Sequence, residues 1–129
     1  MESFDVISTY SRAQAIDDGV LIDLMQDTET AKLCREHYKF PIACTAGVWE
    51  LIQQTISKPK HGNDLLGVLH DILWMSRRNK KAVSNDGCTW LFQVIITGTG
   101  QKRLHTLKLV FEQGDDEEPV LTLMVSEED

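Results

Sequence analysis

Cysteine and histidine are the residues of this chain best suited to metal chemistry. Cys34 and His37 stand three residues apart, so on a helix they share a face, and Cys44 follows soon after. A thiolate and an imidazole are ligands that Zn²⁺ accepts, and His70 offers a further imidazole. The spacing lacks the second short pair typical of structural zinc sites. We therefore favour buried thiols over a metal site, and we expect no cofactor.

Acid–base catalysis is the second chemistry that these residues suggest. Histidine titrates near neutral pH and works best when a carboxylate orients it. Neighbouring residues on a helix point about 100° apart, so Asp71 is poorly placed to orient His70. A small enzyme or metal-binding protein with a site built from Cys34, His37, Cys44 and His70 remains an alternative, but we favour a non-catalytic protein.

Charge is unevenly distributed along the chain, which has a net charge of −7. Residues 1–30 carry −6, residues 31–83 carry +5 and residues 84–129 carry −6. An acidic chain disfavours general nucleic-acid binding, which needs clustered cations, so we expect a protein partner. The candidate partner-binding residues are Arg12, Asp17, Asp18 and Asp23, whose acids would also allow mimicry of a phosphate array. The alternative nucleic-acid-binding residues are Arg77, Arg78, Lys80 and Lys81.

Length and composition predict one ordinary domain over residues 1–129. The chain is 42% hydrophobic and 26% charged, and its apolar runs fall far short of the ~20 residues that span a bilayer. We therefore expect no membrane association. Three cysteines at unrelated spacings fit reduced thiols, which favours the cytoplasm.

Helical signals occupy the first two thirds of the chain. Ser11 and Gln14 fit a capping box, Gly19 fits a left-handed helix stop, and a short buried strand follows at Val20 to Leu24. Further helices are expected at three places: from Asp27 or Thr28 to Tyr38, after Thr45, and from about Leu65 to Asn79.

From Cys88 the hydrophobic period changes to two, which predicts three strands joined by turns at Gly98–Gly100 and Gly114–Pro119. The expected fold is α+β: about four helices and one short strand packed on a C-terminal three-stranded antiparallel meander. Its outer face carries apolar residues, including Leu91, Ile95 and Val110. Another element of the chain or a second copy should cover this face, so a homodimer is an open alternative.

Several segments of the chain carry a family resemblance. The first is Tyr10-Ser-Arg-Ala-Gln-Ala-Ile-x-Asp-Gly-Val-Leu-Ile-Asp23. The others are Phe40-Pro-Ile-Ala-Cys-Thr45, Val48-Trp49, Leu69-His-Asp-Ile-Leu-Trp-Met75 and Gly114-Asp-Asp-x-Glu-Pro-Val-Leu-Thr-Leu-Met124. In these segments the chain resembles an uncharacterised family of small proteins carried by bacterial plasmids, integrative elements and phages. The resemblance implies an accessory protein of a mobile genetic element that binds a host or element protein, as in the inhibition of a host defence complex.

Overall fold

Local capping signals set where the helices begin. The computed structural model describes residues 10–57, 64–78, 81–82, 87–97 and 103–127. Ser11 Oγ accepts the Gln14 N–H and Gln14 Oε1 accepts the Ser11 N–H, which confirms the capping box. Asp27 and Thr45 each accept an amide of the helix that follows them. The described helices are α2 (Arg12–Asp17), α3 (Thr28–His37), α4 (Ala46–Ile56) and α5 (Leu65–Arg78).

Gly19 ends the first helical unit as predicted. Its φ is +80°, a conformation that glycine adopts without the steric cost of a Cβ. The Val20 N–H then donates to the Ala15 oxygen at 2.9 Å, and the short strand β1 follows directly.

Six strands form one mixed sheet in the part of the chain that the structure describes. They lie in the order β1-β2-β6-β5-β4-β3. β2 and β6 run parallel, and every other neighbouring pair is antiparallel. The strands are β1 (Leu21–Asp23), β2 (Ile42–Thr45), β3 (Lys81–Ala82), β4 (Thr89–Ile95), β5 (Leu104–Gln113) and β6 (Pro119–Val125).

The prediction of a C-terminal three-stranded antiparallel meander is wrong. β4, β5 and β6 do pair in sequence order, but β2 joins β6 in parallel and brings β1 with it, while β3 joins β4. The sequence did not reveal β2 because its four residues directly follow Pro41 and the last of them, Thr45, is also the cap of α4. Their parallel partner is the distant segment from Leu121 to Leu123.

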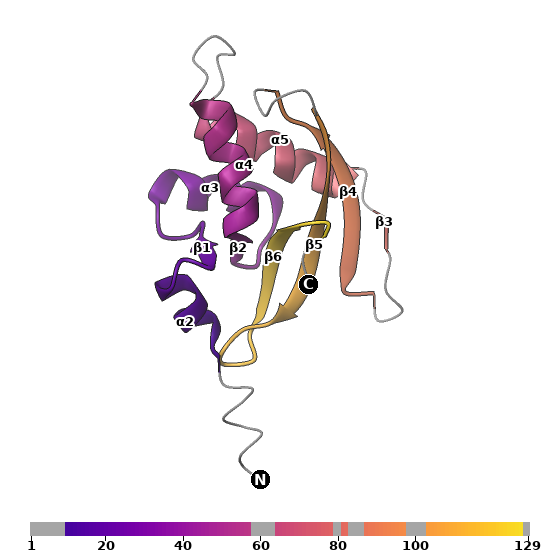
Figure 1. The fold of residues 1–129 in the computed structure, drawn as a ribbon. Coiled ribbons are helices and arrows are strands. Elements are labelled where there is room, and N and C mark those ends of the chain that lie inside the picture. Colours follow the sequence, from indigo (N-terminus) through magenta and orange to yellow (C-terminus); the bar gives the residue numbers. More distant parts are fainter. Residues whose placement is uncertain (1–9, 58–63, 79–80, 83–86, 98–102, 128–129) are drawn as a thin grey trace.

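Three helices, α3, α4 and α5, cover one face of the sheet (Figure 1). Residues of β5 and of the second half of β4 alternate between buried and more exposed positions, as the period of two predicts, whereas Val120 to Leu123 of β6 are all buried. The largest fully buried side chains join the two layers: Val48, Ile52, Leu69, Ile72 and Leu73 from the helices, and Phe92, Leu107, Leu109 and Leu123 from the sheet. No helix among the described residues is long and apolar enough to cross a membrane.

The opposite face of the sheet is covered in part by α2. Arg12 reaches Thr122, which is 3% exposed although it faces away from the core. Beyond α2 lies a groove of about 760 Å³ whose lining includes Leu21, Lys108, Val110 and Met124. Another element of the chain was one of the two expected ways to cover this face, and α2 does so over part of it.

Candidate functional site

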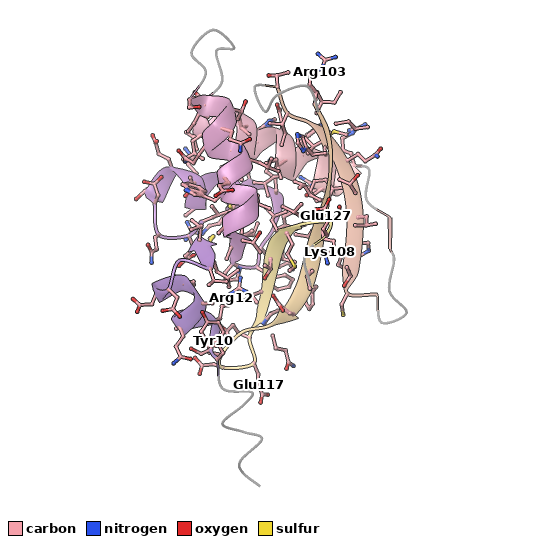
Figure 2. The ribbon with its side chains drawn as sticks, in the orientation of Figure 1. Tyr10, Arg12, Arg103, Lys108, Glu117 and Glu127 are labelled. Atoms are coloured by element: carbon pink, nitrogen blue, oxygen red, sulfur yellow. The ribbon has the colours of Figure 1, made fainter. Side chains whose placement is uncertain are left out.

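Arg12 connects α2 to the hairpin of β5 and β6 (Figure 2). Its guanidinium donates to Thr122 Oγ1 at 2.8 Å and to the Leu121 oxygen at 2.9 Å, and Glu112 lies 3.5 Å away. The Thr122 hydroxyl in turn donates to Glu112. Because 15% of its side chain is exposed, Arg12 acts mainly within its own chain.

Two of the three candidate partner-binding acids also have local contacts. The Tyr10 hydroxyl donates to Asp18 at 2.9 Å, which raises the pKa of Tyr10. Asp23 accepts the Met25 N–H at 2.9 Å in the turn after β1. Asp17 is exposed, and so is Asp18. Contact of a partner with Asp17, Asp18 and Asp23 stays a prediction.

The cysteines proposed as metal ligands lie in the apolar core. Cys34 and Cys44 are 0% exposed. Burial raises the pKa of Cys34 to about 11, with Asp23 adding to this effect and Arg35 opposing it. The described residues contain no group of three or more His, Cys, Asp or Glu side chains that would hold a metal ion. The structure therefore brings His37 and His70 together without the thiols.

Three planar groups follow one another along α5, at positions 70, 74 and 78. The His70 and Trp74 rings are stacked, with centroids 6.1 Å apart and an angle of 16° between their planes. The Arg78 guanidinium lies over the Trp74 ring, 5.1 Å from its centroid. Residues four apart share a helix face, so these groups form a ladder on the surface of α5.

His37 at the end of α3 joins this ladder from the side. Its ring meets the His70 ring edge-on at 5.6 Å, and its Nδ1 lies 3.4 Å from Arg77. Burial, followed by the charges of Arg77 and His70, lowers the pKa of His37, and Glu36 opposes the shift. Of the alternative nucleic-acid candidates, Arg77 and Arg78 lie here; Lys80 falls outside the described residues and Lys81 is described by its backbone alone.

A cavity of about 300 Å³ adjoins Trp74 and is lined by three of the five exposed large hydrophobic residues in the described part of the chain. Trp74, Ile95 and Leu104 are 44%, 63% and 50% exposed, and all three line this cavity. Asp71 and Met75 of α5 and Gln93 and Val94 of β4 complete the lining. We call this cavity with its seven lining residues the Trp74 notch. Large apolar side chains gathered around a hollow, with Arg77 and Arg78 nearby, are typical of a protein-binding surface.

Reasoning from the sequence did not identify the Trp74 notch. The apolar stripe of residues 65–79 predicts a core position for Trp74, and the sequence places Ile95 only on the apolar outer face of the expected meander. One available signal was the spacing of His70, Trp74 and Arg78, because three planar groups four residues apart must share a helix face.

Comparison with protein-family models gives a match over residues 1–129 to a family of unknown function (DUF6573). Neither the curated proteins nor the solved structures contain a significant match to the chain.

Proposed function

The chain belongs to the DUF6573 family of unknown function, and on this premise we propose that it is a binding protein that engages another protein through the Trp74 notch. The observation that carries the proposal is the clustering of Trp74, Ile95 and Leu104 around one cavity. Tryptophan and arginine are the side chains most often responsible for binding energy at protein interfaces.

The resemblance to proteins of plasmids, integrative elements and phages supports the biological setting of this proposal. Such a protein acts in the host cytoplasm as an accessory of the mobile element. Its partner is a host or element protein, and a host defence complex is the favoured target. Binding alone achieves inhibition when it occupies a surface that the target needs.

Nucleic-acid binding through Arg77 and Arg78 is the second candidate, favoured by the nearby aromatic ring of Trp74. Base stacking requires access to the face of that ring. His70 stacks on the ring and Arg78 lies over it, so groups of the chain itself occupy the place of a base. Binding through these cations would weaken steeply with salt, and failure to shift single-stranded or duplex nucleic acid at low salt removes this candidate.

Affinity capture from host cells that carry the element tests the proposal. The tagged wild-type chain is compared with Trp74→Ala and with Val20→Ala, a matched control because Val20 is 51% exposed and directly precedes β1, the strand at the end of the sheet away from β4. A protein partner should be recovered with the wild type and Val20→Ala, and be at least about tenfold depleted with Trp74→Ala. Equal recovery of all proteins by the three chains would contradict the proposal.

A further inference from the structure

In the described part of the chain, the outer edge of β4 has a strand neighbour along only part of its length. β5 pairs with β4 from Thr89 to Ile95, whereas among the described residues β3 pairs only with Trp90 and Leu91. From Phe92 to Ile95 the edge therefore has no partner strand in the described part of the chain. An edge of this kind presents backbone donors and acceptors to any extended segment that reaches it.

The hydrogen bonds between β4 and β5 show which backbone groups face this edge. The Ile96 N–H donates to the Arg103 oxygen, and the Phe111 N–H donates to the Cys88 oxygen. In an antiparallel pair the bonded residues alternate along each strand, so the even-numbered residues of β4 face β5. The N–H and C=O groups of Gln93 and Ile95 consequently point to the outer edge of β4, where the described residues provide no partner strand.

The Trp74 notch lies beside this edge. Gln93, Ile95 and Leu104 belong to the sheet face turned away from the core, whereas Trp74 and Met75 come from α5, which packs against the core face. A cavity lined from both faces lies at the margin of the sheet, and Gln93, Val94 and Ile95 place it along the part of β4 that has no described neighbour on its outer side. Its volume of about 300 Å³ is sufficient for an apolar side chain of such a strand.

Charge around the notch differs along α5. Arg77 and Arg78 stand in the last turn of the helix, one turn beyond Trp74, and Asp71 stands nearly one turn before it. Arg103 directly precedes Leu104 at the start of β5. A partner carboxylate is therefore attracted to the Arg77 and Arg78 end and repelled from the Asp71 end, although the chain as a whole is acidic.

We propose that the partner supplies an extended acidic segment that adds as a strand to β4 at Gln93 and Ile95. One apolar side chain of the segment enters the Trp74 notch, and a carboxylate lies toward Arg77 and Arg78. Main-chain hydrogen bonds supply affinity in this mode of recognition, and alternate side chains supply specificity. The inference rests on the proposed function, because it names the partner segment that the same surface binds.

Ile95→Pro tests strand pairing, because proline removes the N–H that faces the outer edge of β4, while the ladder to β5 does not use that N–H. Since Ile95 also lines the notch, protection of the backbone amides on binding separates strand pairing from the apolar contact. Ile95→Val is the matched control, because it keeps the N–H and most of the side chain. Circular dichroism establishes whether each variant folds.

The probe is a library of random linear peptides displayed on yeast, selected against the wild-type chain and followed by synthesis of the most enriched peptide. Enriched peptides should alternate apolar and polar residues and carry acids. Binding should be at least about tenfold weaker to Ile95→Pro and to Trp74→Ala, and within about twofold of wild type for Ile95→Val. Hydrogen exchange at the Gln93 and Ile95 amides of the wild type should slow when the peptide binds, a readout that does not depend on the proline variant.

The outcomes distinguish the two levels of the proposal. Loss of binding with Trp74→Ala but not Ile95→Pro, without protection of the two amides, overturns strand addition and leaves the notch as a binding surface. Unchanged binding to Trp74→Ala overturns the proposed function as well. Failure to enrich any peptide overturns strand addition by a partner segment. Self-association of the wild type that Ile95→Pro abolishes also overturns it, because a second copy of the chain would then occupy the edge of β4.

Discussion

The carboxylate of Asp115 accepts the backbone N–H of Arg12 at 2.7 Å, across 103 residues of sequence. The same carboxylate accepts the Ala13 N–H at 3.0 Å, so the turn between β5 and β6 caps the first turn of α2. Two segments of the family resemblance, the opening one and the one that begins at Gly114, therefore form one structural unit. The contact between these two segments stabilises the fold, which explains why both belong to the resemblance.

Replacement of Asp115 by Ala should lower the free energy of unfolding by about 1 kcal/mol, because two amides of α2 lose their acceptor. Urea denaturation measures this change. Asp116→Ala is the control, since Asp116 is exposed in the same turn and its backbone N–H, which donates to Glu118, is retained. Equal loss in both variants would mean that the turn itself, and not the cap, is responsible.

Replacement of Arg12 by Lys should destabilise the chain by roughly 1–3 kcal/mol, although the charge is kept. A lysine ammonium cannot reproduce the fork that reaches both Thr122 Oγ1 and the Leu121 oxygen, and it leaves one of these partly buried groups unpaired. Thermal and urea unfolding of Arg12→Lys are compared with Arg35→Lys, an exposed arginine on α3. Similar stability of the two variants would contradict the role of the fork.

Thiol reactivity should separate the three cysteines. Burial raises the pKa of Cys34 to about 11, so its thiolate is scarce near neutral pH, and Cys44 is equally inaccessible. Cys88 is partly exposed and should be the one that reacts quickly with a disulfide reagent in the folded chain. Absorbance measures one fast thiol in the native chain and three in urea; a fast phase that survives Cys88→Ser would contradict this assignment.

His37 should make the fold less stable in mild acid. Its pKa is lower in the folded chain than the usual value of 6.5, so protons bind more weakly to the folded state. The free energy of unfolding is therefore unaffected above the pKa that His37 has in the unfolded chain. It falls as the pH drops from that value through the lower pKa of His37 in the folded chain. Nuclear magnetic resonance titration should place the His37 midpoint lower in the folded chain than in urea, and His37→Gln should flatten the acid loss of stability. Equal midpoints would contradict this prediction.

Local signals predicted much of the fold, and contacts between distant segments account for what they missed. Ser11, Asp27 and Thr45 cap helices through neighbouring amides, so a few residues of sequence suffice to identify them. Ile42–Thr45 is a strand because β6 lies beside it in parallel, and no local period signals that pairing. The mixed six-stranded sheet could therefore not be predicted from local sequence patterns, because it depends on the pairing of β2 with β6.

The candidate site was harder to predict than the fold for a related reason. Periodicity assigns Trp74 to the edge of the apolar stripe of α5, but its exposure depends on which distant elements pack beside α5, and the local sequence does not specify them. The neighbouring sequence gives Arg12 no local role, whereas the structure shows contacts of Arg12 to Leu121, Thr122 and Asp115. Charged residues in a sequence are candidates for partner binding, but their contacts within the folded chain determine whether they are available for it.

The most direct test of the central claim is the dissociation constant between the purified chain and its captured protein partner. Isothermal titration calorimetry compares the wild type with Trp74→Ala and Val20→Ala. A binding surface at the Trp74 notch predicts that Trp74→Ala weakens binding at least about tenfold, equivalent to ~1.4 kcal/mol, while Val20→Ala leaves it unchanged. Equal dissociation constants for the wild type and Trp74→Ala would contradict the account.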